Sequence, residues 1–209
     1  MSLSVLYYYI ENRKRYKMNK SFFALAFRMK YINRWGLMHS TRYETLSEHC
    51  ADTAILAHAL AVIGNKYFGK NYNADRVMTL AMYHDLCEVY TGDLPTPVKY
   101  SSDDMKKAYK EIERLSCEKI LSKLPEELRE DFDSILNPNG TDAEYERLVK
   151  SADKLSALLK CIEELHNGNP EFKSAYESTK ASIVNSTCEE LHYFMDNFLE
   201  SFTLTLDEM

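Results

Sequence analysis

Hydrophobic residues recur along most of the chain at the three- and four-residue spacing of amphipathic helices. This pattern predicts helices over residues 20–33, 45–63, 74–90, 103–123, 125–136, 143–166, 171–185 and 187–202. The alternation of hydrophobic and polar residues that is typical of strands is not sustained anywhere. The sequence therefore predicts an all-α, bundle-like domain.

Local signals indicate where some of these helices begin and end. Thr45 and Glu48 match a capping box at the start of the second helix. Pro95 and Pro97 prevent the third helix from continuing, so we expect a stiff loop over residues 91–102. Residues 34–44 show no clear period and contain glycine, so we expect a loop there as well.

The first seventeen residues differ from the rest of the chain. They read MSLSVLYYYIENRKRYK, which is rich in tyrosine and charge, and the helical pattern begins only after Met18. We interpret residues 1–17 as an N-terminal extension or leader and residues 18–209 as one functional domain.

Composition narrows the class of protein. The chain has 209 residues, 45% hydrophobic and 28% charged, which is the ordinary mixture of a globular domain. Its net charge of −6 argues against binding to polymeric nucleic acid, although a few local basic residues can still hold one phosphate. No apolar run reaches the ~18 residues of a membrane span, so we expect no membrane association.

The chain has five cysteines, an odd number without a CxxC pair: Cys50, Cys87, Cys117, Cys161 and Cys188. Each one lies within a helical apolar pattern. We therefore predict reduced core cysteines and a cytoplasmic protein.

The candidate chemistry centres on the dipeptide His84-Asp85 inside an apolar helix. Such a pair alone is common in protein cores, but His49 lies near the start of another helix and Asp153 lies beside the apolar stripe of a third. Buried carboxylates need a cation or hydrogen-bond donors. Two imidazoles and two carboxylates suit one divalent ion such as Zn, Mn, Co or Fe.

A further acid accompanies this set. Glu88 follows His84 by four residues and Asp85 by three, so a continuous helix would place all three on one face. A carboxylate that lies beside a metal without binding it can transfer protons in a hydrolysis. We therefore predict a catalytic role for Glu88.

The order His49, His84-Asp85, Asp153 resembles the pattern of the HD phosphohydrolase superfamily. Within it, the chain is similar to the bacterial 5′-deoxynucleotidases of the YfbR type over about residues 18–208. The runs that carry this resemblance are 32–35 (INRW), 47–49 (SEH), 81–85 (AMYHD), 91–100 (TGDLPTPVKY), 125–129 (PEELR), 160–165 (KCIEEL) and 204–208 (LTLDE). The run 91–100 is the most specific. The departures are Gly36 where proline is expected, Cys87, and the added N-terminus.

The resemblance implies an HD-domain helical bundle that hydrolyses deoxyribonucleoside 5′-monophosphates as a homodimer, with one divalent ion such as Co, Mn or Zn. The implied metal ligands are His49, His84, Asp85 and Asp153. The implied catalytic residues are Glu88, Arg34 and Asp93. The implied substrate contacts are Arg34, Trp35, His49, Asp93, Leu94, Pro95, Thr96 and Asp153. In this scheme Arg34 orients the phosphate, and Trp35 packs on the sugar and disfavours a ribose 2′-hydroxyl.

Two other interpretations remain open at this point. Another HD enzyme, acting on nucleoside triphosphates, alarmones or cyclic dinucleotides, would share the same ligand set. The last of these usually needs extra histidines, and the chain has none between Asp85 and Asp153. A non-catalytic nucleotide-sensing HD domain would also keep the ligands, but it would have less need of Glu88 and Arg34.

Overall fold

The computed structural model describes residues 20–99, 101–140 and 142–209. Throughout these residues the secondary structure is helical, and the strand-type pairing among them is one isolated bridge between Asn33 and Thr45. The prediction of an all-α domain is thus confirmed. Residues 1–17 lie outside the described residues, so their interpretation as an extension stays a prediction.

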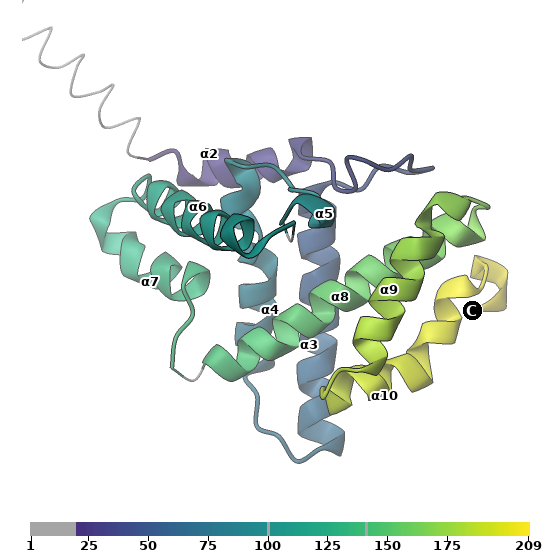
Figure 1. The fold of residues 1–209 in the computed structure, drawn as a ribbon. Coiled ribbons are helices and arrows are strands. Elements are labelled where there is room, and N and C mark those ends of the chain that lie inside the picture. The colour runs from purple at the N-terminus through teal and green to yellow at the C-terminus, as the bar shows by residue number, and fades with distance from the viewer. Residues whose placement is uncertain (1–19, 100, 141) are drawn as a thin grey trace, which may run out of the picture.

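Figure 1 shows the order of the elements. The α-helices are α2 (Phe22–Ala26), α3 (Leu46–Tyr67), α4 (Ala74–Tyr83), α5 (Thr96–Lys99), α6 (Asp103–Leu121), α7 (Glu126–Leu136), α8 (Asp142–His166), α9 (Lys173–Val184) and α10 (Glu189–Phe198). The 3₁₀ segments are η1 (Phe27–Tyr31), η2 (Leu86–Val89), η3 (Pro170–Phe172), η4 (Leu199–Thr203) and η5 (Leu206–Glu208).

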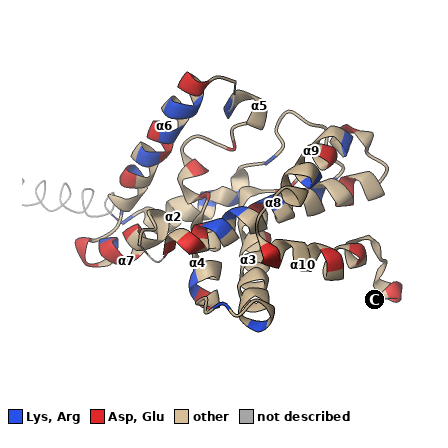
Figure 2. Ribbon diagram, turned by 60° about the horizontal axis from the view of Figure 1, so that its bottom comes forward, with Lys and Arg blue, Asp and Glu red and all other residues tan. Residues whose placement is uncertain are grey.

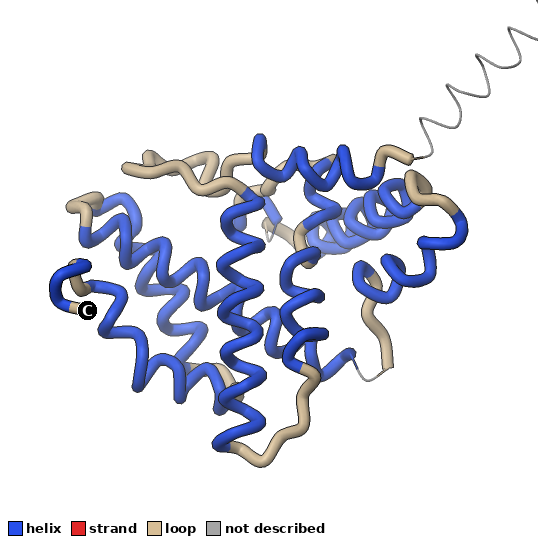
Figure 3. Tube along the Cα trace, turned by 180° about the vertical axis from the view of Figure 1, so that it is seen from behind, coloured by secondary structure: helices blue, strands red, loops and turns tan. Residues whose placement is uncertain are grey.

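The main core lies where α8 crosses the neighbouring helices α3 and α4 (Figures 1 and 3). Leu60 of α3, Val77 of α4 and Leu155 of α8 are completely buried there, and Leu191 adds α10 to the same cluster. Burying one such side chain contributes about 1.5–3 kcal/mol. This packing fixes α3 and α4 against α8.

A second core holds the elements above this crossing. Phe22 of α2, Leu46 of α3, Leu86 of η2 and Ile120 of α6 are all buried in it. This cluster fixes η2, which carries Glu88, between α2 and α6. On the outer side of α6, Lys and Arg alternate with Asp and Glu, which is a solvated surface of mixed charge (Figure 2).

The third predicted helix, residues 74–90, is wrong in its second half. α4 ends at Tyr83, Asp85 has non-helical backbone angles (φ −102°, ψ 10°), and η2 follows as a 3₁₀ turn. The Ala81 carbonyl accepts from both the backbone N–H and the side-chain Nδ1 of His84, which tightens the chain into a three-residue turn. The apolar pattern continues past this break because Leu86 and Cys87 are buried in the second core. The first predicted helix is likewise divided, into α2 and η1.

The prediction of reduced cysteines is wrong for one pair. Cys87 of η2 and Cys117 of α6 form a disulfide, whereas Cys50, Cys161 and Cys188 are buried and free. The apolar pattern indicated burial at each position, but it carries no signal that residues 30 apart are neighbours. Because disulfides persist mainly in oxidising compartments, cysteine usage no longer supports the cytoplasmic location, which stays a prediction.

Within the parts of the chain that the structure describes, no helix is both long and apolar enough to cross a membrane.

Candidate metal centre and substrate site

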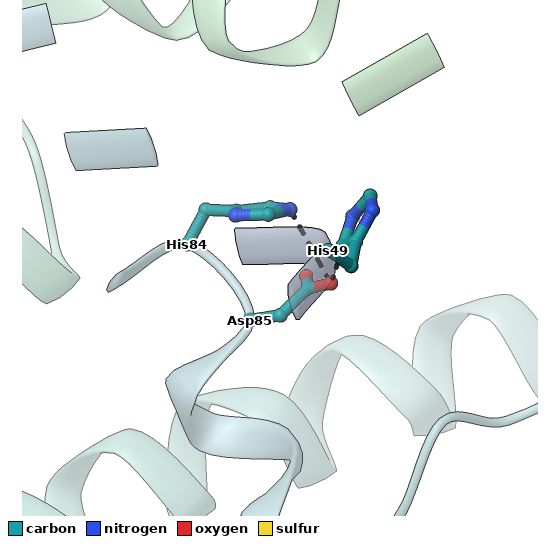
Figure 4. Close-up of side chains that lie close together, drawn as sticks. All are labelled: His49, His84 and Asp85. Atoms are coloured by element: carbon teal, nitrogen blue, oxygen red, sulfur yellow. Dashed lines mark ion pairs between the residues drawn. The ribbon is translucent and has the colours of Figure 1, made fainter. Parts of the chain in front are cut away.

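His49, His84 and Asp85 converge on one point although they come from different elements (Figure 4). His49 lies in the first turn of α3, and His84 and Asp85 lie in the break after α4. One carboxylate oxygen of Asp85, Oδ2, lies 3.3 Å from His84 Nε2 and 3.7 Å from His49 Nε2. The candidate ligand atoms of the three residues all lie within 4.8 Å of one another.

Asp153 of α8 completes this cluster. Its Oδ1 lies 3.1 Å from His49 Nε2 and 4.0 Å from His84 Nε2. The Asp153 side chain is 40% exposed, whereas His49 is fully buried, so solvent reaches the cluster from the side of Asp153. The crossing of α8 over α3 and α4 is what brings the four residues together.

These residues fit a divalent metal. Nε2 of His49 and Nε2 of His84 are buried and lack a hydrogen-bond partner among the described residues, which is costly unless another group satisfies them. His84 Nδ1 lies 2.7 Å from the Ala81 carbonyl. Since a carbonyl only accepts, Nδ1 carries a proton, and Nε2 is the nitrogen that would bind a cation, giving up any proton of its own. His49 Nδ1 lies 3.1 Å from the Ser156 hydroxyl, which orients the second ring.

The charges of the cluster also favour a cation. Burial by itself raises the pKa of Asp85, but the neighbouring His84 and His49 imidazoles and the Arg34 guanidinium outweigh it and lower that pKa. The pKa of Asp153 is lowered in the same way, by His49 and His84. Conversely, Asp85 raises the pKa of His84 well above its ordinary value even though burial lowers it. Both carboxylates are therefore ionised at neutral pH.

Arg34 lies next to this cluster. Its Nη1 is 3.4 Å from Asp85 Oδ2, and its Nε donates to Glu44 Oε2 at 3.2 Å. Burial by itself lowers the pKa of Arg34, but the carboxylates of Asp153, Asp93, Glu44 and Asp85 together raise it. A permanent positive charge thus lies at the edge of the candidate metal centre.

Trp35 is half-buried and has an unusual backbone conformation. Its φ of +58° lies in the left-handed region, which costs a non-glycine residue free energy and occurs mainly at functional sites. The indole Nε1 donates to Glu44 Oε2 at 2.9 Å, and the ring packs against Phe172 with centroids 5.2 Å apart. The side chain is therefore held on two sides.

Glu88 of η2 uses only one of its oxygens. Oε1 accepts from Lys99 Nζ at 2.8 Å and from the Tyr109 hydroxyl at 3.2 Å. Oε2 is buried and has no partner among the residues that the structure describes. Burial and the charge of Asp85 raise the pKa of Glu88 to about 7, although Lys99 acts in the opposite direction.

Glu88 does not share a helical face with His84 and Asp85 as predicted, because α4 ends at Tyr83. Glu88 reaches the site instead through the 3₁₀ turn, in which its backbone N–H donates to the Asp85 carbonyl at 2.9 Å. Neither Lys99 nor Tyr109 was among the predicted residues. Lys99 lies within the run 91–100, and that position was the only signal for it in the sequence.

The predicted substrate loop follows η2 directly. Asp93, Leu94 and Pro95 are partly buried, and Thr96 is the first residue of α5. The negative charge of Asp93 acts on both Arg34 and Glu88, so its carboxylate is near both. Contact of Leu94, Pro95 and Thr96 with substrate stays a prediction.

Sequence reasoning also missed the residues that hold the loop of residues 34–44. Glu164 of α8 accepts hydrogen bonds from the backbone N–H groups of Thr41 and Arg42, and Lys160 Nζ donates to the Arg42 carbonyl and to Glu164. Asn169 Nδ2 donates to the His39 carbonyl. Lys160 and Glu164, which are one helical turn apart on α8 and of types usually found at the surface, are thus buried because they fasten this loop.

Comparisons with solved structures identify the class of fold. An HD-domain phosphohydrolase from Listeria innocua superposes with a TM-score of 0.76 at 20% identity, covering 87% of this chain and 88% of that one. An HD phosphohydrolase of cyanophage S-2L, bound to dA and one catalytic Zn²⁺ ion, superposes with a TM-score of 0.60 at 21% identity, covering 87% and 96%. The fold is therefore that of the HD-domain phosphohydrolases, as the sequence predicted.

Sequence comparison identifies the family. The model of the YfbR-like 5′-deoxynucleotidases matches residues 21–202. A 5′-deoxynucleotidase of Photorhabdus laumondii is 48% identical over 188 residues, which is 90% of this chain and 95% of that protein. The 5′-deoxynucleotidase YfbR of Escherichia coli is also 48% identical, over 90% and 94%. The chain belongs to the YfbR-like 5′-deoxynucleotidase family.

Proposed function

We propose that this protein is a metal-dependent 5′-deoxynucleotidase, which hydrolyses deoxyribonucleoside 5′-monophosphates to deoxynucleosides and phosphate. One observation carries the proposal: two imidazole nitrogens without a hydrogen-bond partner and two ionised carboxylates converge beside a partly buried arginine. Such a set suits a divalent ion and a phosphate together. The relatives that are 48% identical to it over 188 residues bear the name of this activity.

The proposed cofactor is one divalent ion, such as Co, Mn or Zn, held by His49, His84, Asp85 and Asp153. When bound, such an ion activates a water molecule and polarises a phosphate oxygen. A single ion is supported by the absence of any histidine between Asp85 and Asp153. The cyanophage neighbour with its one catalytic Zn²⁺ ion agrees with this stoichiometry.

Arg34 binds and orients the phosphate in this proposal. Its charge does not depend on pH, and its planar group can present two N–H donors to phosphate oxygens. Asp93 attracts the same guanidinium and keeps it in the site. His49 and Asp153, whose Nε2 and Oδ1 atoms lie 3.1 Å apart, are further contacts of the bound phosphate in this proposal.

Glu88 holds the proton that moves during hydrolysis. Lys99 and Tyr109 occupy Oε1, so Oε2 is the oxygen that exchanges a proton with the attacking water or with the leaving 5′-oxygen. Its raised pKa places both protonation states within reach near neutral pH.

In this proposal the Trp35 indole packs against the sugar of the substrate. A flat indole in a fixed position can exclude a ribose because it needs to clash only with the additional 2′-hydroxyl oxygen. Leu94, Pro95 and Thr96 follow Asp93 in the chain and form the remaining wall of the substrate site.

We further propose a homodimer in the cytoplasm. Apolar side chains are exposed on α3 and at the C-terminal end of the chain, among them Ile55 and Phe202, which line one groove of about 440 Å³. Light scattering would test the dimer: a mass of one chain would reject it.

The deciding experiment measures phosphate release from 2′-deoxyadenosine and adenosine 5′-monophosphates, using chelator-stripped protein with Co, Mn, Zn or Mg added back. Release from the deoxy compound alone, dependent on metal, is the expected result. Release from both compounds keeps the enzyme and rejects the sugar selectivity. No release from folded protein with any metal favours another HD substrate or a nucleotide sensor.

A further inference from the structure

One buried carboxylate, Glu44, joins the two residues that face phosphate and sugar in the proposed function. The same oxygen, Oε2, accepts from Trp35 Nε1 at 2.9 Å and from Arg34 Nε at 3.2 Å. Glu44 is only 5% exposed, so both bonds are shielded from water. A charged acceptor in such a place forms stronger hydrogen bonds than a neutral one.

The backbone is shaped so that both donors reach this oxygen. Adjacent side chains normally point to opposite sides of an extended chain. The left-handed conformation of Trp35, with φ +58°, turns the chain after Arg34. The Arg34 N–H donates to the Glu44 carbonyl, and the bridge between Asn33 and Thr45 continues this pairing. The strained backbone at Trp35 therefore occurs together with hydrogen bonds that involve Glu44 or its neighbour Thr45.

The part of the loop of residues 34–44 that precedes Glu44 is also held in place. Glu164 and Lys160 of α8 bind the backbone of Thr41 and Arg42. Phe172 supports the opposite side of the indole. Glu44 thus lies on a fixed base and not on a free surface loop.

We infer that Glu44 is a positioning residue that fixes Arg34 and Trp35 relative to each other and thereby sets the preference for deoxyribose. This inference rests on the proposed function of the site. Rejection of one hydroxyl requires the sugar wall to lie at a constant distance from the phosphate anchor, because a displacement of ~1 Å suffices to admit or exclude it. A shared acceptor provides that constancy, since neither residue can shift without losing a bond to Glu44.

The test compares Glu44→Gln with a matched control, Glu146→Gln. The control removes a partly exposed carboxylate of α8 whose ion pair, among the described residues, is with Lys150. For each protein, kcat and KM are measured with 2′-deoxyadenosine and adenosine 5′-monophosphates. We expect Glu44→Gln to lower the deoxy-to-ribo ratio of kcat/KM by about tenfold, the effect of one lost hydrogen bond to a charged group. Glu146→Gln should keep the wild-type ratio.

A second readout does not depend on turnover. Trp35 is the only tryptophan of the chain, so intrinsic fluorescence reports its surroundings directly. Glu44→Gln should change the emission maximum and the quenching by deoxyadenosine 5′-monophosphate. Unchanged emission and an unchanged ratio in a folded Glu44→Gln protein would overturn the inference. If the wild-type protein releases no phosphate, the proposed function fails and the inferred sugar preference fails with it, whereas the emission spectrum still decides whether Glu44 positions Trp35.

A double-mutant cycle guards against a variant that simply misfolds. Trp35→Phe keeps an aromatic ring but removes the N–H that Glu44 accepts, so it carries little risk to folding. If Glu44 acts through Trp35, adding Glu44→Gln to Trp35→Phe changes the deoxy-to-ribo ratio by much less than Glu44→Gln alone. Full additivity of the two effects would overturn the inference.

Discussion

Lys99 Nζ lies 2.8 Å from Glu88 Oε1, and this ion pair closes the segment that contains Asp93–Thr96. Glu88 stands just before that segment and Lys99 just after it, so the pair fixes both ends of the predicted substrate loop. Burial by itself lowers the pKa of Lys99, but Glu88 outweighs it and raises that pKa. The lysine is therefore charged throughout the neutral range and holds the carboxylate by one oxygen.

Replacing Lys99 with methionine should lower kcat by about tenfold, because general acid–base catalysis depends on the position of the proton-transferring group. KM for the deoxynucleotide should change less, because Lys99 is not expected to contact the phosphate. Steady-state kinetics check this. Lys107→Met, at an exposed position of α6, is the control and should keep the wild-type kcat. Lys99→Arg keeps the positive charge beside Glu88 and should retain more activity than Lys99→Met. A kcat within twofold of wild type would contradict the role of Lys99.

Glu88→Ala should bind substrate but turn it over slowly, with kcat reduced by about 10²-fold or more. The reason is that Oε2 is the carboxylate oxygen left free for proton transfer. Binding is followed by the fluorescence of Trp35 and turnover by phosphate release. Near-normal turnover in this variant would remove Glu88 from the chemistry.

Metal addition should stabilise the fold, because the proposed ligands come from α3, the end of α4, and α8. At a free metal concentration of about 100 times Kd, binding to the native state alone adds about 2.7 kcal/mol to the free energy of unfolding. Thermal unfolding of chelator-stripped protein, with and without Co²⁺, measures this gain. Asp153→Asn should show a smaller increase in Tm, and an equal increase would exclude Asp153 from the site.

Acid should weaken the fold through Glu190, a buried carboxylate of α10. It accepts from the Tyr72 hydroxyl at 2.9 Å and from the Arg147 guanidinium at 3.2 Å. Although burial raises its pKa, the hydrogen bonds from Arg147 and other donors lower it from 4.5 to about 2. A lowered folded-state pKa stabilises the native state above the unfolded pKa, and this stabilisation is lost as pH falls from about 4.5 towards 2.

The contribution of Glu190 amounts to roughly 2–3 kcal/mol at neutral pH. Urea unfolding at a series of pH values measures it. Glu190→Gln should be less stable than wild type at pH 7, and the difference should shrink below pH 4. A difference that stays constant with pH would show that Glu190 contributes by packing alone.

Reduction of the disulfide between Cys87 and Cys117 should destabilise the protein. Closing a loop of 30 residues restricts the unfolded chain, which stabilises the native state by about 3–4 kcal/mol in the chain-entropy treatment. Denaturant unfolding with and without dithiothreitol measures the effect. Cys117→Ser should already have the lower stability and should not respond to the reductant. Equal stability of oxidised and reduced wild type would contradict this account.

The three- and four-residue spacing of hydrophobic residues was sufficient to predict the all-α fold, because positions that follow it, such as Leu60 and Leu155, are buried in the core. The residue types and order of His49, His84, Asp85 and Asp153 were sufficient to predict that they meet. The break after Tyr83 escaped prediction because the buried Leu86 and Cys87 continue the apolar pattern through a different helical geometry. Glu44, Lys160 and the disulfide partner Cys117 escaped it because their roles depend on contacts between distant segments, which a single sequence does not display.

Helix α8 carries Asp153 at the candidate metal centre and Glu164 at the base of the loop of residues 34–44, which contains Trp35. The two positions are eleven residues apart, or about 16 Å along the helix axis. In the proposed function, the single helix α8 therefore supports both the reacting centre and the loop that selects the sugar, and it does so through different residues. In the proposed function, a substitution at Glu164 would act on the loop of residues 34–44, which carries Trp35, and would leave the four candidate metal ligands in place. The proposed sugar preference could then change separately from the metal-dependent chemistry.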